Sequence, residues 1–212
     1  MIADGGILTS DAILDAAEDV LRRYGPGKAN VVDVARALGV SHGSVYRHFP
    51  SKVALRDAVA ERWLARVSRP LAVIAAGDGP PLDRLRRWLD QLTGSKQRMA
   101  REDPELFATF DQITAEARQV VTAHVGNLAE QIARILADGA AAGEFADVDP
   151  AVAGRAFLQA TARFHHPAHA AQWSDPAVGA DLLAVRSLLE SGLLARPRST
   201  PRAQSPVARA TT

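Results

Sequence analysis

Apolar residues recur along most of this chain at the spacing of one helical face, and few segments alternate in the manner of a β-strand. The spacing predicts a first helix that begins near Ser10, its expected N-cap, and ends at Gly25-Pro26-Gly27. A second helix is predicted over 31–38, with Asn30 as its cap and the Asp33 carboxylate among the free amides of its first turn. We therefore expect an all-α protein.

A third, short helix is predicted over 41–49. Gly39 follows the second helix as a C-terminal stop that tolerates the left-handed conformation, and Ser41 can cap the next helix. Val45 and Phe49, four residues apart, supply its apolar face. Two short helices joined by a tight turn that contains glycine form the helix-turn-helix pattern, which binds DNA.

The rest of the chain predicts a larger second domain. A fourth helix is expected over 52–68, and the break at Arg69-Pro70, followed by "AAGDGPP", suggests a domain boundary. Further helices are predicted over ranges separated by prolines and a glycine, namely 82–100, 104–112, 114–141, 150–165 and 176–193. We expect a helix-turn-helix domain at 8–68, a C-terminal helical domain at 69–195, and a disordered tail rich in proline and arginine at 196–212.

Charge is concentrated in one region although the formal net charge is only +1. Between Arg22 and Arg56 there are seven basic residues and a single acid, Asp33. Such a local basic patch favours a polyanion, although a solvated helical face can have the same composition.

The third helix also concentrates hydrogen-bonding side chains opposite Val45 and Phe49. His42 and Arg47 are the best candidates for base edges, because arginine pairs bidentately with guanine. Gly43 allows close backbone approach, Ser44 and Tyr46 can donate to phosphate, and Lys52 offers a point charge at the next helix start. The candidate DNA-binding residues are Asn30, Val31, Ser41, His42, Gly43, Ser44, Tyr46, Arg47, His48 and Lys52.

Several function classes find no support in the sequence. The chain has no cysteine, hence no thiolate metal site or cysteine nucleophile, and it contains no Gly-x-Ser-x-Gly, phosphate-loop or His-Glu-x-x-His motif. We therefore expect neither an enzyme nor a cofactor. No signal peptide and no run of about 18 apolar residues is found, so a cytoplasmic location without membrane contact is expected.

A histidine cluster, "RFHHPAH" at 163–169, leaves two readings. His165, His166 and His169 could supply metal ligands, but Pro167 breaks the helix that would align them and no cysteine or acid completes the set. A structural role, with one histidine capping helix 150–165 and another lining a pocket or a dimer seam, is favoured over a metal site.

Residues 13–64, "ILDAAEDVLRRYGPGKANVVDVARALGVSHGSVYRHFPSKVALRDAVAERWL", resemble the DNA-binding domain of the TetR/AcrR transcriptional regulators. The resemblance includes the Gly-Val-Ser turn, the Gly-Ser-Val-Tyr run and the His-Phe-Pro-Ser-Lys junction. Asn30 departs from the threonine or serine usual in the family. The resemblance implies a connecting fourth helix and a C-terminal domain that binds an effector and dimerises through its last two long helices, here 150–165 and 176–193.

The residues expected at these two sites follow from that resemblance. The candidate effector pocket comprises apolar and amphipathic residues that would fit a core equally well: Trp88, Leu92, Phe107, Phe110, Ile113, His124, Leu128, His166 and Trp173. The candidate dimer interface comprises Phe157, Phe164, Leu182, Val185, Leu188 and Leu189. A twofold homodimer predicts a palindromic operator with half-sites about 34–36 Å apart or a multiple of that.

The sequence thus predicts a DNA-binding transcriptional repressor that a small apolar or amphipathic effector releases from double-stranded DNA. The alternative is a constitutive or architectural DNA-binding protein without an effector.

Overall fold

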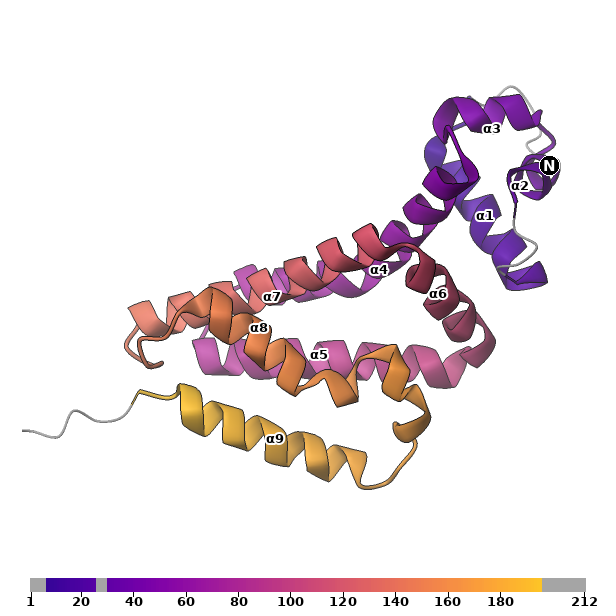
Figure 1. Cartoon of the computed structure of the whole chain (residues 1–212). Coiled ribbons are helices and arrows are strands. Elements are labelled where there is room, and N and C mark those ends of the chain that lie inside the picture. The colour runs from indigo at the N-terminus through magenta and orange to yellow at the C-terminus, as the bar shows by residue number, and fades with distance from the viewer. Residues whose placement is uncertain (1–6, 26–29, 196–212) are drawn as a thin grey trace, which may run out of the picture.

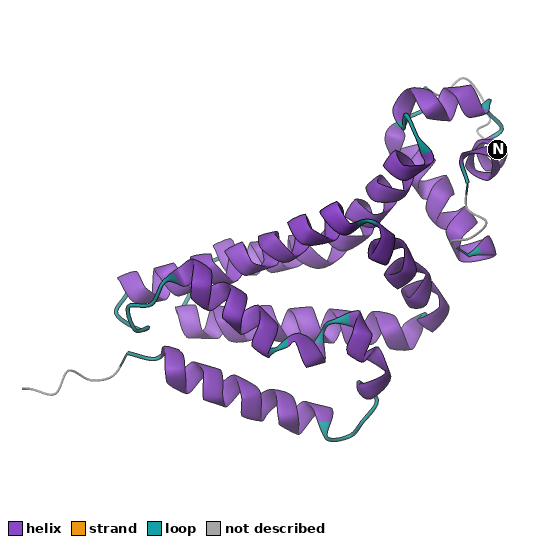
Figure 2. Cartoon of the chain, in the orientation of Figure 1, coloured by secondary structure: helices purple, strands orange, loops and turns teal. Residues whose placement is uncertain are grey.

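The computed structural model describes residues 7–25 and 30–195, so Lys28 and the predicted tail at 196–212 lie outside the described part. Within these ranges the regular elements are helices joined by loops and turns (Figure 2), and an isolated bridge connects Phe145 with Leu194. The α-helices are α1 (Ser10–Tyr24), α2 (Val31–Leu38), α3 (His42–His48), α4 (Lys52–Ala76), α5 (Pro81–Glu102), α6 (Pro104–Glu116), α7 (Arg118–Ala141), α8 (Pro150–Ala160) and α9 (Val178–Leu193). Figure 1 shows α1–α3 grouped at one end, with α4 running from them along the other helices.

Local capping chemistry sets the N-terminal helices. Asn30 Oδ1 accepts from the Asp33 amide at 3.0 Å, and Ser41 Oγ accepts from the Ser44 amide at 3.1 Å. Gly39 ends α2 with φ 70°, a left-handed conformation that a side chain would disfavour. The predicted cap of α1 is wrong by one residue, because the Thr9 hydroxyl, not Ser10, accepts from Ala12 N at 3.2 Å.

The predicted break at Arg69-Pro70 is wrong, since α4 continues through Pro70 to Ala76. A proline inside a helix costs about 3 kcal/mol. The second half of α4 buries Val67, Leu71 and Ala75 against α5 and α7, and each large buried apolar side chain contributes about 1.5–3 kcal/mol. Packing therefore outweighs the proline penalty, and one helix joins the two ends of the molecule.

The C-terminal helices also differ in their ends from the prediction. Helix α8 stops at Ala160, not 165, and is followed by the 3₁₀ segments η1 (Ala162–Phe164) and η2 (Pro167–Gln172). Thr161 Oγ1 donates to the Phe157 carbonyl at 2.9 Å, a local bond that competes with the helix ladder. Asp103 and Asp149 cap α6 and α8, each directly before a proline. Helix α9 begins at Val178, two residues after the predicted start at Pro176.

Two apolar clusters form the core of the described chain. The first combines α1–α3 and the first half of α4 with Phe107, Phe110 and Ile113 of α6. The second combines the rest of α4 with α5, α7 and α8 around the fully buried Trp88, whose Nε1 donates to Gln131 Oε1 at 3.0 Å. Since α4 belongs to both clusters, any displacement of α4 reaches both.

Candidate DNA-binding surface and effector domain

Helix α3 packs against the protein through Val45, and most of its other residues are exposed to solvent. Val45 is fully buried and Phe49, which follows the helix, is nearly so. Most of the other residues of the helix are exposed polar side chains and a glycine, namely His42, Gly43, Tyr46, Arg47 and His48, and Lys52 is exposed at the start of α4. Six of the predicted DNA-contacting residues are therefore accessible to a ligand.

Hydrogen bonds organise the side chains of this surface. Ser44 Oγ lies 2.9 Å from Ser41 Oγ and accepts from Arg47 Nη2 at 3.2 Å. Ser41 therefore caps the start of α3, and Ser44 accepts a hydrogen bond from Arg47, in addition to any contact that they make with phosphate. The His48 ring is tied to α1 through a 3.2 Å contact between its Nδ1 and Ser10 Oγ. Arg47 is thus positioned by its own helix while its guanidinium stays exposed.

Two predicted DNA-contacting residues, Asn30 and Val31, lie at the start of α2. The side chain of Val31 is buried in the core of the N-terminal helices, so any contact of Val31 with DNA falls to its backbone. The Asn30 carbonyl oxygen is used by the Asp33 amide. Asn30 is exposed, which leaves its side-chain NH₂ group available to a phosphate.

The basic patch is smaller than the sequence suggests. Arg22 pairs with Asp19 at 2.9 Å, Arg36 with Asp33 at 2.8 Å, and Arg56 with Glu116 at 2.6 Å. Sequence counting missed Asp19 and Glu116 because they lie outside the counted stretch. Among the described basic residues of this stretch, Arg23, Arg47 and Lys52 make no ion pair, so the unpaired positive charge lies at the end of α1, on α3 and at the start of α4.

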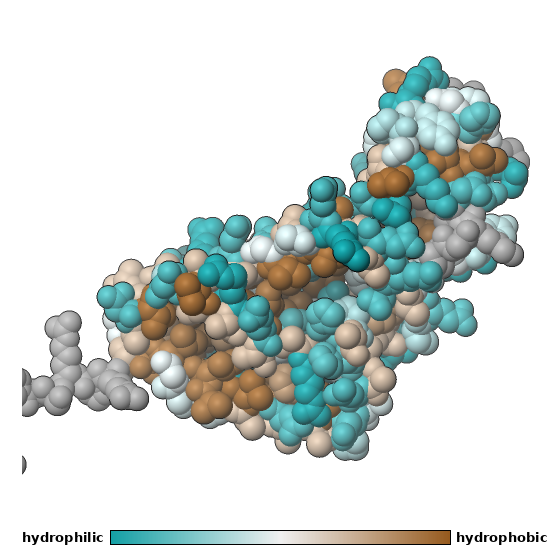
Figure 3. All heavy atoms as spheres, in the orientation of Figure 1, coloured by the Kyte–Doolittle hydropathy of each residue, from teal (hydrophilic) through white to brown (hydrophobic). Residues whose placement is uncertain are grey.

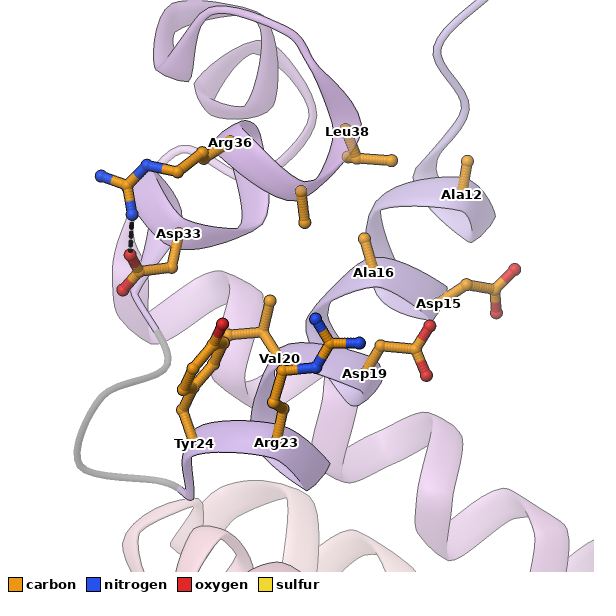
Figure 4. A pocket seen from close by; sticks show the side chains of 11 residues that line it. Ala12, Asp15, Ala16, Asp19, Val20, Arg23, Tyr24, Asp33, Arg36 and Leu38 are labelled. Atoms are coloured by element: carbon orange, nitrogen blue, oxygen red, sulfur yellow. Dashed lines mark hydrogen bonds and ion pairs between the residues drawn. The ribbon is translucent and has the colours of Figure 1, made fainter. Parts of the chain in front are cut away.

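An open groove of about 830 Å³ lies between α1 and α2, and no residue of α3 lines it (Figure 4). Its walls carry the carboxylates of Asp15, Asp19 and Asp33 beside Arg23 and Arg36. Mixed charge with an excess of acid is unfavourable for DNA. This groove is therefore a poorer candidate for a DNA-binding surface than the exposed residues of α3.

A smaller cavity of about 290 Å³ lies where α6 meets the N-terminal helices. Its apolar lining includes Leu21, Val34 and Val59, and Arg56 and Glu116 also line it. Of the predicted pocket residues, only Ile113 lines this cavity.

The aromatic residues predicted to line an effector pocket are packed against other side chains. Trp88, Leu92 and Leu128 are buried in the second apolar cluster. The rings of Trp63 and Phe110 stack with centroids 4.9 Å apart, and Phe107 meets Trp173 edge-on at 5.9 Å. Burial of these residues reflects core packing, which apolar spacing alone does not distinguish from a ligand wall.

Three titratable groups with shifted pKa values, Lys96 of α5, His124 of α7 and His165 after η1, lie close enough for the Lys96 charge to act on both histidines. Burial lowers the pKa of Lys96 to about 8, and burial lowers the pKa values of His124 and His165 to about 4. His166, which was predicted to line the pocket, is exposed and caps η2 through Nδ1, which accepts from Ala168 N at 3.2 Å. The buried histidine of the cluster is instead His165, and Lys96 was not predicted at all.

The predicted dimer residues divide into two groups. Phe157 and Phe164 are buried within the protomer, so the prediction that they form an outer surface is wrong. On α9, Leu182, Val185 and Leu189 are half-buried and Leu188 is 75% exposed. Leu183 of α9 and Val152 of α8 are also exposed, and Figure 3 shows apolar residues gathered over this part of the molecule.

No group of three His, Cys, Asp or Glu side chains suited to a metal ion occurs in residues 7–25 and 30–195. Within the same ranges, no helix combines the length and the apolar character needed to cross a membrane.

Two family models match the chain. Residues 13–59 match the tetR family of bacterial regulatory proteins, and residues 81–186, half of the chain, match the tetracyclin repressor-like C-terminal domain. The chain therefore belongs to the TetR family.

Curated relatives carry helix-turn-helix names. The HTH-type transcriptional regulator Rv1255c of Mycobacterium tuberculosis is 37% identical over 103 residues, which cover 49% of this chain and 49% of the relative. The HTH-type transcriptional repressor KstR of Mycolicibacterium smegmatis is 30% identical over 128 residues, 60% of this chain and 62% of KstR. The chain spans about half the length of the Mycobacterium tuberculosis relative that it matches.

Solved structures share the fold. SmeT, the repressor of the Stenotrophomonas maltophilia multidrug efflux pump SmeDEF, is similar with a TM-score of 0.65 at 18% identity, over 95% of this chain and 98% of SmeT. A SmeT–triclosan complex gives a TM-score of 0.64 at 16% identity, over 94% of this chain and 99% of that chain. The predicted all-α fold, with a helix-turn-helix domain and a C-terminal helical domain, is confirmed.

Proposed function

We propose that this protein is a homodimeric, sequence-specific DNA-binding repressor that a small molecule releases from its operator. The observation that carries the proposal is the exposed, unpaired Arg47 on a short helix anchored by Val45 and Phe49. The repressor names of relatives such as KstR support the same function. No catalytic role is proposed, because a regulator needs none.

In this proposal α3 enters the major groove. Arg47 and His42 face base edges, while Tyr46, Lys52 and the Asn30 amide contact phosphates. The bond from Arg47 to Ser44 Oγ limits the rotamers of the guanidinium before DNA binds, which lowers the entropy lost on binding.

We place the dimer interface on α8 and α9. The exposed Leu183, Leu188 and Val152 are large apolar groups with no cover among the described residues of the protomer. A twofold axis through this surface would bury them and place two copies of α3 about 34–36 Å apart, or a multiple of that, on a palindrome.

Effector release requires a link between the two ends of the molecule. Helix α4 is one continuous element that shares side chains with both apolar clusters, so a ligand that shifts α4 changes the distance between the two α3 helices. Allosteric coupling of this kind amounts to about 1–3 kcal/mol. A neighbour of similar fold, SmeT, has been solved with triclosan, which supports a small-molecule effector. We further propose that the DNA-binding domain, 8–68, and the effector-binding and dimerisation domain, 69–195, divide within α4. A regulator of this kind acts in the cytoplasm, where its DNA lies.

The competing function is a constitutive or architectural DNA-binding protein. Selection of bound sequences from random duplex DNA at near-physiological salt distinguishes the two. Recovery of a palindrome supports the dimeric repressor, and salt-sensitive recovery of unrelated sequences supports the architectural role.

A further inference from the structure

Lys96 is a buried cation without an acidic partner. It lies on α5, is 5% exposed, and forms no ion pair within 4.0 Å among the described residues. The chain has only three lysines, so its other positive charges are mostly arginines. A lysine in such a position is an energetic cost unless it binds something.

The groups that face Lys96 do not neutralise it. Its Nζ lies 4.6 Å from the centroid of the Trp63 ring on α4, a cation–π contact that offsets part of the desolvation cost. His124 from α7 and His165 after η1 are near enough for the Lys96 charge to lower their pKa values further, so both rings are neutral near pH 7. Asp111 on α6 raises the pKa of Lys96 by its charge, but it is exposed and makes no ion pair with it.

The ammonium group remains mostly charged near pH 7, because its pKa of about 8 is still above that value. Trp63, over which Lys96 lies, is itself packed among apolar groups. Phe107 and Phe110 are buried beside Trp63, whereas Met99 and Trp173 are only partly buried and cover the first apolar cluster from outside. Trp173 belongs to the turn after η2 and is held by Phe107 and by a 2.9 Å bond from its Nε1 to the Arg163 carbonyl. A series of ring contacts therefore leads from the partly buried Trp173 through Phe107 to Trp63, over which the Lys96 ammonium lies.

We infer that the effector of this protein is an amphipathic acid whose carboxylate pairs with Lys96 and whose apolar body lies among Trp63, Phe110 and Trp173. The inference rests on the proposed function, because it names the chemical class of the effector. A charge-assisted bond between the carboxylate and Lys96 would replace the missing counter-ion in a site of low dielectric constant. The neutral imidazoles of His124 and His165 place no competing positive charge beside it.

The test uses the full chain and a panel of straight-chain carboxylates from hexanoate to hexadecanoate, with phenylacetate and 2-naphthoate, each paired with its uncharged primary amide. Dissociation constants are measured by tryptophan fluorescence and by calorimetry. We expect at least one carboxylate to bind about tenfold or more tightly than its amide, the ratio expected for a charged hydrogen bond. This comparison in the unaltered protein needs no variant.

Two variants on α5 then assign the effect to Lys96. Lys96→Met keeps the apolar stem and should lose the preference for the acid, and it should fold because it removes a buried charge. Arg98→Met removes an exposed positive charge from the same helix and should retain the preference. If no carboxylate binds, if acid and amide bind equally, or if Lys96→Met keeps the preference, the inference is wrong.

Operator binding without any ligand is measured in parallel, which separates this inference from the proposed function. If the carboxylate test fails while specific operator binding is observed, the protein is still a repressor and only the proposed class of effector is wrong. Absence of specific operator binding removes the proposed function itself.

Discussion

Arg56 of α4 donates from Nη1 to Glu116 Oε2 at the end of α6, over 2.6 Å. The pair spans residues that are 60 positions apart in sequence and borders the cavity between α6 and the N-terminal helices. The Arg56 side chain is 26% exposed and that of Glu116 is 59% exposed. This pair therefore links α6, which carries Phe107 and Phe110, to the first turns of α4, the helix that follows α3.

A double-mutant cycle on Arg56→Met and Glu116→Gln should give a coupling of about 0.5–1 kcal/mol in the free energy of unfolding, because the pair is largely solvated. Urea denaturation of the four proteins measures it. The exposed pair of Arg22 and Asp19, within α1, is the matched control and should give about 0.5 kcal/mol or less. A coupling no larger than that of the control would mean that the Arg56 contact does not link the two helices.

Glu18 is the buried counter-charge between α1 and α4. Its carboxylate accepts from Arg62 Nε at 2.8 Å and from Arg66 Nη2 at 2.6 Å, and its side chain is 9% exposed. Glu18→Ala should lower the free energy of unfolding by about 2–4 kcal/mol, since it removes the buried carboxylate and leaves the largely buried Arg62 with the exposed Asp15 as its remaining acidic partner. Thermal and urea unfolding measure this.

Asp15 provides the control for Glu18 because it also pairs with Arg62, at 2.8 Å, but with its own side chain exposed. Asp15→Asn should cost about 1 kcal/mol or less. Equal losses for the two variants would contradict the distinction between a buried and a solvated carboxylate.

Gly154 allows α8 to approach α7 closely. A Cβ atom at this position would lie 2.7 Å from the Ala129 carbonyl oxygen, which is backbone and cannot move aside cheaply. Gly154→Ala should destabilise the protein by about 1–3 kcal/mol. Gly126→Ala on α7 meets nothing within 4 Å and should stabilise it by up to about 1 kcal/mol. Melting temperatures that shift in the same direction for both variants would contradict the close approach.

Much of the N-terminal domain could be predicted because its signals are local. Asn30, Gly39 and Ser41 act through their own turns, and each behaves in the structure as its chemistry predicts. Pro70 predicts a break that does not occur, because burial of Leu71 against distant helices outweighs the local penalty of the proline.

The residues of the effector-binding domain could not be assigned from the sequence for a different reason. Core aromatics and ligand walls share the same helical spacing, so Phe107 and Trp88 could not be assigned from the sequence. Lys96 did carry a signal, since it follows Leu85, Leu89 and Leu92 on the apolar face of α5, but in "GSKQRM" it resembles a surface lysine.

The buried, neutral state of His165 should make the stability of the protein depend on pH. Burial lowers its pKa from 6.5 to about 4, so between these values the unfolded chain binds more protons than the native protein. The free energy of unfolding should therefore fall as the pH drops from about 6.5 to 4, with a contribution from His165 on the order of 3 kcal/mol. Urea titrations of the unaltered protein and of His165→Gln measure the difference. A parallel fall in both proteins across this window would contradict a neutral, buried His165.

The most direct test of the account is the ratio of affinities for the selected palindrome and for a shuffled duplex, at about 150 mM salt, compared among the unaltered protein, Arg47→Ala and Lys52→Ala. The unaltered protein should favour the palindrome by about 10³-fold or more. Arg47→Ala should reduce the ratio, whereas Lys52→Ala should weaken both duplexes alike and lower the salt slope by about one. An unaltered protein that binds both duplexes equally would contradict sequence-specific reading by α3.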